Sequence, residues 1–196
     1  ITVTTTGMGP YYEDNKKTIT LDYQMLQIIL DLYDESHAKM KHTEENRWHY
    51  FNNVVRFLLY HELGHALISA YHLPVLGQEE DAADALGAII ALNYVKRGYH
   101  TLLDSADFFS VLDKYEKKDN HAYWNEHALS KQRYFRLLCY AYGRYPQEVE
   151  GKLKEYYHHE LDEFIKERRD YCVDEYHQTY GDWMDLLKPY LINRVP

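Results

Sequence analysis

Two histidines four residues apart flank a glutamate in the stretch HELGHALISAYHLPVLGQEEDAAD, which runs from His61 to Asp84. On a helix, residues four apart lie on one face about one turn apart, so His61 and His65 can present two imidazole nitrogens to a single Zn²⁺. Glu62 is rotated by roughly 100° from His61, near the open position of such a metal but not forced to bind it. A base that takes a proton from a zinc-bound water needs this placement. The HExxH spacing therefore predicts a zinc site with its catalytic base.

The same helical face is apolar towards its N-terminus, where Val54 and Leu58 lie, so the histidines fall on a stripe that we expect to be buried. Two core histidines that only hydrogen-bond to their neighbours are the alternative without a metal. The acidic residues that follow favour the metal site.

A catalytic zinc needs a third protein ligand and an open fourth position. The cluster Glu79, Glu80, Asp81 and Asp84 opens the next predicted helix, where Glu80 and Asp84 share a face and Glu79 shares its face with Ala83. We expect Glu80 to bind the metal and Asp84 to hydrogen-bond to a ligating histidine and so orient it. Acidic residues also collect in a first helical turn because they complement the helix dipole. That explanation accounts for one or two of the four, and not readily for Asp84.

The short connection after the HExxH helix predicts that the two helices are antiparallel neighbours. The second helix carries many alanines and Gly87, which would let it approach Gly64 and Ala66 closely.

The elements around these two helices are predicted to be one small sheet followed by helices. A β-branched start, a GMGP turn and the alternating segment TITLDY indicate a small antiparallel sheet within the first 23 residues. Helices are expected around 26–33, 47–71, 79–95, 105–115 (capped by Asp104 or Ser105), 130–143 (capped by Ser130), from Pro146 onward, and 169–187. This is an α+β fold, mostly α-helical, in a single domain over residues 1–196.

The charge balance is acidic, with 22 Lys and Arg against 31 Asp and Glu and a formal net charge of −9. Without a basic block, nucleic acid and anionic membrane are not expected as main partners. No apolar run approaches the roughly 20 residues that a membrane span needs. Because the chain opens at Ile1 without a charged leader segment, we expect a mature chain from which a leader has been removed.

Cys139 and Cys172 are the two cysteines, and their spacing fits neither a zinc ribbon nor a redox motif. From the spacing alone, two buried thiols and one disulfide in an exported protein are equally good interpretations.

The combination of HELGHALI with LPVLGQEEDAAD resembles the gluzincin arrangement, HExxH followed by ExxxD. More narrowly, it resembles a bacterial family described only as putative metallopeptidases. The likeness extends to GPYYEDNKKTITLDY, YWNEHALSKQRYFRLLCYAYG and YCVDEYHQTYGDW, and so covers most of the chain. The resemblance implies a zincin-like fold, zinc as cofactor and hydrolysis of peptide bonds. Because family members commonly carry export signals, it also implies a periplasmic or secreted location and a Cys139–Cys172 disulfide.

The segment WNEHALSKQRYF contributes three further candidates, Trp124, His127 and Arg133. As functional residues, His127 or Arg133 would steady the oxyanion of a tetrahedral intermediate, and we place His127 among the catalytic residues with Glu62. As structural residues, Trp124 would anchor the core, Arg133 would form a salt bridge and His127 would lie on a surface loop.

The sequence thus predicts a zinc-dependent peptidase of the gluzincin type, acting on a peptide or protein substrate that could pair with the N-terminal strand. His61, His65 and Glu80 would hold the zinc, and Glu62 would be the general base. One alternative is a non-catalytic zinc-binding protein that serves as a protein-interaction module, and another is a helical interaction module without metal. Glu62 separates these hypotheses, because a structural site does not need a glutamate there.

Overall fold

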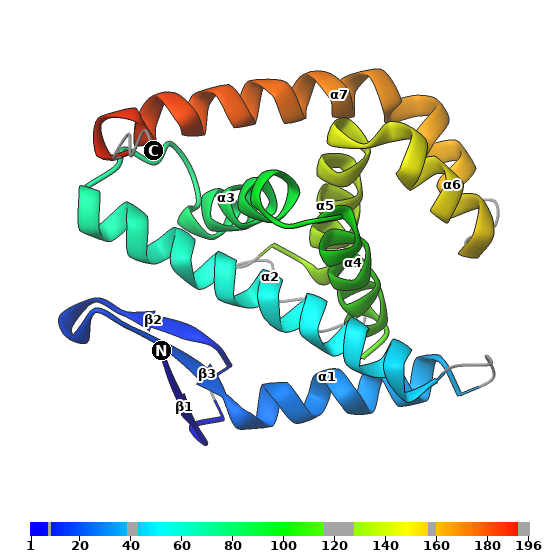
Figure 1. The fold of residues 1–196 in the computed structure, drawn as a ribbon, viewed down its shortest axis with the longest axis horizontal. Coiled ribbons are helices and arrows are strands. Elements are labelled where there is room, and N and C mark those ends of the chain that lie inside the picture. The colour runs from blue at the N-terminus through cyan, green and yellow to red at the C-terminus, as the bar shows by residue number, and fades with distance from the viewer. Residues whose placement is uncertain (8, 39–42, 116–127, 157–159, 192–196) are drawn as a thin grey trace.

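The computed structural model describes residues 1–7, 9–38, 43–115, 128–156 and 160–191, and most of them are helical (Figure 1). The strands are β1 (Thr2–Thr4), β2 (Tyr11–Glu13) and β3 (Thr18–Asp22), with the short helix η1 (Asp14–Lys16) before β3. The helices are α1 (Tyr23–Ser36), α2 (Glu44–Tyr71), α3 (Glu79–Tyr94), α4 (Tyr99–Asp113), α5 (Ser130–Arg144), α6 (Pro146–Tyr156), α7 (Glu160–Leu187) and the short η3 (Lys188–Tyr190). The predicted α+β class with mostly helical content is confirmed. The single domain over residues 1–196 stays a prediction.

The sheet is mixed, so the prediction of an antiparallel sheet is wrong in part. β3 is the central strand, antiparallel to β2 and parallel to β1. The chain reverses near Gly7 and Gly9, which have φ values of 72° and 80°, and again at Lys17, with φ 49°. Two reversals restore the direction of β1, which therefore pairs with β3 in parallel. Alternation along TITLDY marks β3 as a strand but does not determine which strand lies at each edge.

The long helix α2 runs across the molecule, with the sheet and α1 on one side and α3 on the other (Figure 1). Thr43 caps its start, because the Thr43 side chain accepts a hydrogen bond from the backbone N–H of Asn46 at 3.2 Å. His72 ends it in the left-handed conformation, with φ 50°. Fully buried apolar side chains of α2 and of the helices around it form the core, among them Ile29, Val54, Phe57, Leu92, Leu102 and Leu137.

The helix boundaries agree with the sequence where hydrophobic spacing defined them and differ where a capping residue did. α2 and α3 match the predicted ranges closely. The predicted cap of α4 at Asp104 or Ser105 is wrong, because α4 begins at Tyr99 and Ser105 lies inside it. The Ser105 hydroxyl donates to the carbonyl of Thr101 at 2.7 Å. This hydrogen bond to the preceding turn lets a serine lie inside the helix, where it does not act as a cap.

The predicted starts of two further helices, α5 and α7, also differ from the structure. Leu129, not Ser130, is the N-cap of α5, and the Gln132 side chain accepts a hydrogen bond from the Leu129 N–H at 3.2 Å. α7 begins at Glu160, well before the predicted start near Arg169.

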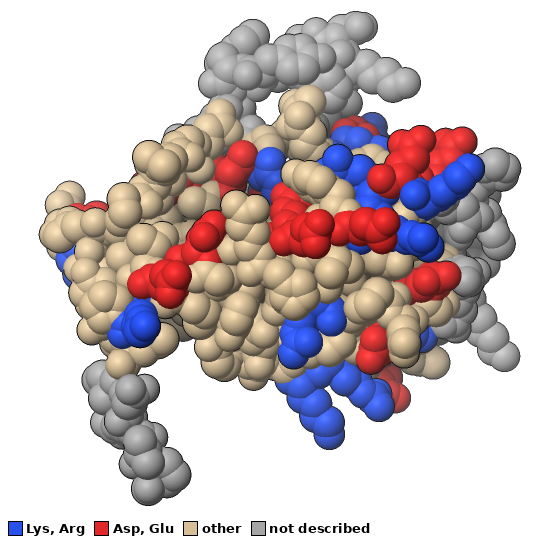
Figure 2. Space-filling view, turned by 90° about the horizontal axis from the view of Figure 1, so that it is seen from above, with Lys and Arg blue, Asp and Glu red and all other residues tan. Residues whose placement is uncertain are grey.

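The face of the molecule on which α7 lies carries a band of Asp and Glu side chains with Lys and Arg beside it (Figure 2). In the sequence of α7, acidic residues outnumber basic ones, in line with the net charge of −9. Among the described helices, none is long and apolar enough to cross a membrane.

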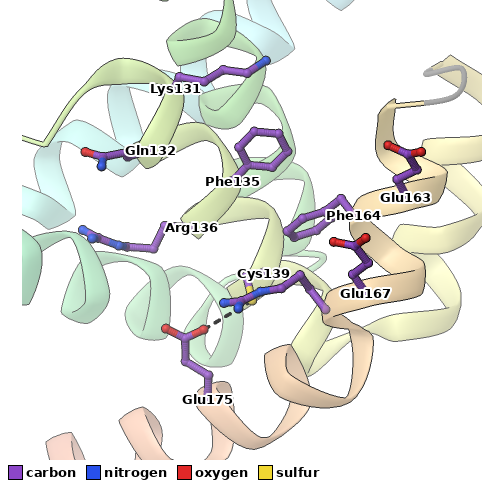
Figure 3. Close-up of a pocket in the computed structure, with 10 residues that line it drawn as sticks. Lys131, Gln132, Phe135, Arg136, Cys139, Glu163, Phe164, Glu167 and Glu175 are labelled. Carbon is purple, nitrogen blue, oxygen red and sulfur yellow. Dashed lines mark hydrogen bonds between the residues drawn. The ribbon is translucent and has the colours of Figure 1, made fainter.

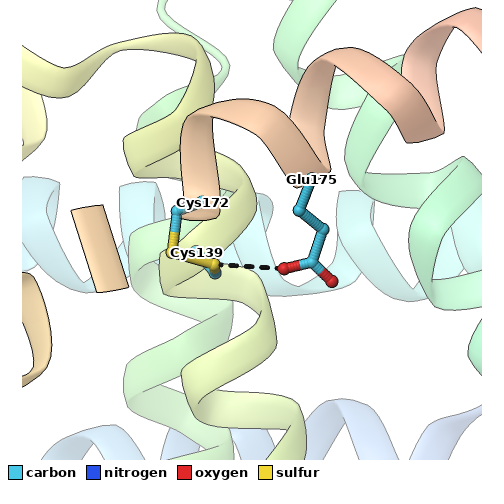
Figure 4. The surroundings of a disulfide bond; sticks show 3 residues. All are labelled: Cys139, Cys172 and Glu175. Carbon is cyan, nitrogen blue, oxygen red and sulfur yellow. Dashed lines mark hydrogen bonds between the residues drawn. A yellow bond between two sulfur atoms is a disulfide. The ribbon is translucent and has the colours of Figure 1, made fainter. Parts of the chain in front are cut away.

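Cys139 of α5 and Cys172 of α7 form a disulfide, with their Cα atoms 4.9 Å apart (Figure 4). The two helices are close at this point, because a Cβ at Gly143 would overlap the carbonyl oxygen of Cys172. The carboxylate of Glu175 contacts the Cys139 sulfur at 3.3 Å, and burial raises the pKa of that carboxyl. The disulfide that the family resemblance implied is therefore confirmed, and it fixes α5 to α7.

Removing the disulfide is expected to lower stability without changing the fold. The bond spans a sequence separation of 33 residues, so its loss frees the unfolded chain and should lower the free energy of unfolding by about 2–4 kcal/mol. Urea denaturation of the Cys139→Ser/Cys172→Ser double variant measures this. Adding a reductant should bring the wild-type midpoint down to that of the variant. Equal midpoints under non-reducing conditions would contradict the prediction.

Candidate metal centre

His61 and His65 lie on the face of α2 that is turned towards α3. His61 is only 3% exposed, and the rings of the two histidines are 4.9 Å apart between centroids. Their Nε2 atoms approach to 3.2 Å. The HExxH spacing has therefore brought two imidazole nitrogens to one point, as one face of a helix requires.

The backbones of α2 and α3 are almost in contact beside the histidines. A Cβ at Gly64 would lie 3.0 Å from the Cα of Ala83, and a Cβ at Gly87 would lie 3.1 Å from the backbone nitrogen of His61. His61 of α2 meets Gly87 of α3, and Gly64, further along α2, meets Ala83, which lies earlier in α3. The two helices are therefore antiparallel. The predicted close approach is confirmed at Gly64, and that at Ala66 stays a prediction.

This approach brings the Glu80 carboxylate to the two imidazoles. Its Oε2 lies 3.1 Å from Nε2 of His61, and its Oε1 lies 3.4 Å from Nε2 of His65. One donor atom from each of the three residues lies within 4.8 Å of the others, so they form a group that could hold a metal ion. The residues proposed from the sequence as ligands are the ones that meet in space.

The opposite nitrogen of each imidazole bonds to a different carboxylate. Nδ1 of His61 lies 2.7 Å from Asp84 Oδ1, and Nδ1 of His65 lies 2.8 Å from Glu79 Oε1. A carboxylate on Nδ1 fixes the tautomer and the ring orientation and leaves Nε2 free to face the centre. The placement of Asp84 behind a histidine agrees with the sequence prediction. The contact of Glu79 with His65 was missed, since the helical-face argument paired Glu79 only with Ala83.

The second contact of Asp84 is with Arg133 of α5. The guanidinium donates to both carboxylate oxygens, from Nε to Oδ2 at 2.8 Å and from Nη2 to Oδ1 at 2.6 Å. It also lies 4.0 Å above the ring of Phe109. Of the two roles considered for Arg133, the salt bridge is confirmed, and the oxyanion contact stays a prediction.

Negative charge dominates around the two Nε2 atoms. Burial alone would lower the pKa of His65, but its hydrogen bonds with Glu80 and Glu79 outweigh burial and raise the pKa to about 9. Burial would also lower the pKa of His61, but the hydrogen bonds of His61 with Asp84 and Glu80 outweigh burial. The pKa of His61 is therefore raised as well. Burial would raise the pKa of Asp84, yet Arg133 and His61 hold it well below its usual value. A cation at the centre, either a proton or a metal ion, is therefore stabilised by these carboxylates.

Glu62 is buried beside this group without belonging to it. Only 5% of the residue is exposed, and its negative charge is one of the causes that raise the pKa of His65. Its position next to His61 on α2 follows from the sequence alone. His127 and Trp124 lie outside the described residues, so the role of His127 stays a prediction.

A cavity of about 600 Å³ lies between α5 and α7, away from the histidines (Figure 3). Phe135 of α5 and Phe164 of α7 line it and contact each other, with ring centroids 5.3 Å apart. Charged side chains of both signs surround the two rings, among them Lys131, Arg136, Glu163, Glu167, Arg168 and Glu175. None of the three residues of the candidate group lines this cavity. Arg136, which lines the cavity, also pairs with Asp81 of α3.

The fold and the site define a mostly helical α+β protein whose His/Glu group has the composition of a metal centre. The chain belongs to the family described as "Putative metallopeptidase", whose model matches residues 1–187. No curated protein and no solved structure matches the chain. Membership confirms the resemblance to this family, which implies a metal and supports a peptidase role, while the gluzincin arrangement and the zincin-like fold stay predictions.

The close contact of α2 and α3 is expected to be intolerant of one methyl group. Gly64→Ala should lower the free energy of unfolding by about 1–3 kcal/mol, because the new Cβ would press on the backbone of Ala83. Gly181→Ala is the matched control, since it also lies within a helix but has open space around it. That variant should gain up to about 1 kcal/mol from helix propensity. Equal stability of the two variants in chemical denaturation would show that α2 and α3 are not in tight contact.

Proposed function

We propose that the protein is a zinc-dependent peptidase of the gluzincin type, with His61, His65 and Glu80 as the zinc ligands. The observation that carries the proposal is the meeting of their three donor atoms within 4.8 Å, with a carboxylate behind each imidazole. Membership of the metallopeptidase family supports it independently.

The donor set fits zinc. Two imidazole nitrogens and one carboxylate oxygen are the ligands of one well-known class of catalytic zinc site, and three protein ligands leave a position open for water or substrate. Glu79 is a poorer candidate for the third ligand. It bonds to Nδ1 of His65, on the far side of the ring from Nε2, and its side chain is 51% exposed.

We assign the role of general base to Glu62 because it is buried next to the proposed ligand His61. When bound, zinc supplies Lewis-acid polarisation of the scissile carbonyl and lowers the pKa of a water molecule. The Glu62 carboxylate accepts the proton of the attacking water and passes it to the nitrogen of the leaving amine. Its burial keeps bulk water from screening the carboxylate, and its neighbour His61 is held in place by Asp84.

An extended peptide is the proposed substrate, and an outer strand of the sheet is its proposed backbone partner. β2 lies at an edge of the sheet, and the adjoining η1 touches α2 through a hydrogen bond from Ser69 to Asp14. A sheet edge can add a further strand through main-chain hydrogen bonds. The proposed location is extracytoplasmic, which the Cys139–Cys172 disulfide supports because such bonds persist in oxidising compartments.

The second candidate function is a non-catalytic zinc-binding module for protein interaction. The network of carboxylates around the histidines would serve a structural zinc equally well. Buried Glu62 favours the peptidase, because a structural site has no use for a proton acceptor next to its ligand.

Glu62→Gln tests the peptidase directly. The amide keeps the shape of the side chain but cannot accept a proton, so turnover of a broad peptide pool should fall by ~10²-fold or more. Zinc content, measured by mass spectrometry of the metal, should stay near that of the wild type, and so should the thermal midpoint. Glu45→Gln is the matched control, since it removes an exposed carboxylate in the first turn of the same helix, far along α2 from His61 and His65, and it should keep most of its turnover.

Undiminished turnover in zinc-replete Glu62→Gln would falsify the proposed mechanism. Zinc bound by the wild type without cleavage of any peptide in the pool would instead favour the interaction module.

A further inference from the structure

Two arginines of α5 reach two aspartates of α3, one helical turn apart. Arg133 pairs with Asp84, and Arg136 pairs with Asp81 through both of its terminal nitrogens. The two pairs join the same helices with the same chemistry. They differ in what the aspartate touches next.

The Arg133 pair continues to the proposed zinc ligand. Asp84 Oδ1 accepts from Arg133 at 2.6 Å and lies 2.7 Å from His61 Nδ1, so one oxygen joins the guanidinium to the imidazole. All three side chains are largely closed to water: 11% of the Arg133 side chain is exposed, 3% of that of Asp84 and 4% of that of His61. The Arg136 pair is more open, at 27% and 39%, and no contact of Asp81 with a histidine is found among the described residues.

The guanidinium of Arg133 is itself held in a fixed plane. Its Cζ lies 4.0 Å from the ring centre of Phe109, a buried residue of α4. Two parallel N–H groups of an arginine match the two oxygens of a carboxylate, which restrains rotation of the carboxylate about its last bond. α4 and α5 thus determine where Oδ1 of Asp84 points.

We infer that Arg133 is a positioning residue of the metal centre, acting through Asp84 on the imidazole of His61. This inference rests on the proposed function, since it needs His61 to be a ligand. While the two N–H groups of Arg133 (the guanidinium fork) bind the Asp84 carboxylate, the carboxylate holds the His61 ring so that Nε2 faces His65 and Glu80. Without the fork, Asp84 keeps its bond to His61 in several orientations, and the ring loses its fixed direction. Arg136 gives α3 and α5 a second connection but does not orient a ligand.

Zinc affinity in competition with a chelating dye distinguishes these roles. Arg133→Met should weaken zinc binding by about 10-fold or more, in the range seen when the outer partners of metal ligands are removed. Arg136→Met should leave zinc affinity within about 2-fold of the wild type, because it breaks an ion pair that does not lead to a ligand. Arg133→Lys, which keeps the charge but not the fork, should fall between Arg133→Met and the wild type.

A double-variant cycle tests whether Arg133 acts through Asp84. If it does, Arg133→Met should weaken zinc binding in the wild type but cause almost no further loss in Asp84→Asn protein. Thermal midpoints are recorded for all variants, and if Arg133→Met does not fold, Arg133→Lys carries the same cycle. Equal losses of zinc affinity in Arg133→Met and Arg136→Met, or additive losses in the cycle, would overturn the positioning role.

Failure of the inference is separable from failure of the proposed function. If the wild type binds zinc and His61→Ala abolishes binding while Arg133→Met and Arg133→Lys do not weaken it, only the role of Arg133 is wrong. If the wild type does not bind zinc at all, both the zinc site and the positioning role are overturned.

Discussion

The contact between the backbones of α2 and α3 is the constraint on which the site depends. Gly64 and Gly87 leave no side chain at the crossing, so the two helices lie close enough for Glu80 to reach both imidazoles. With a larger residue at either position the helices would separate, and the carboxylate would no longer meet two Nε2 atoms. HExxH alone supplies two nitrogens on one helical face. The oxygen comes from how tightly a second helix packs against that face.

Burying this many charged groups is costly unless each has a partner. Asp84 lies between His61 and Arg133, and the loss of one member of such a buried pair typically costs about 3–5 kcal/mol because the other is left uncompensated. The site is therefore part of the core and not an addition to its surface. The Cys139–Cys172 disulfide lies further from the histidines. It links α5, the helix that carries Arg133, to α7.

Local spacing predicted much of this site, and long-range pairing accounts for what it did not predict. His61, His65 and Glu80 could be found because helical geometry relates them over short distances in sequence, and small residues indicated that α3 would pack on α2. Arg133 could be recognised as a salt-bridge candidate, but its partner lies 49 residues away, and no periodicity relates the two. The same limit applies to β1, whose parallel pairing with β3 depends on the path of the chain between them. Capping residues misled at Ser105, because a serine inside a helix can bond to the carbonyl one turn back.

In the proposed site, α2 and α3 together bind one zinc ion through His61, His65 and Glu80. A crystal structure of the zinc-loaded protein, with diffraction data on both sides of the zinc absorption edge, tests it most directly. We expect a single strong anomalous peak bounded by Nε2 of both histidines and the Glu80 carboxylate, with Asp84 and Glu79 still bonded to the Nδ1 atoms. A peak elsewhere, or zinc held through Glu79 in place of Glu80, would contradict it.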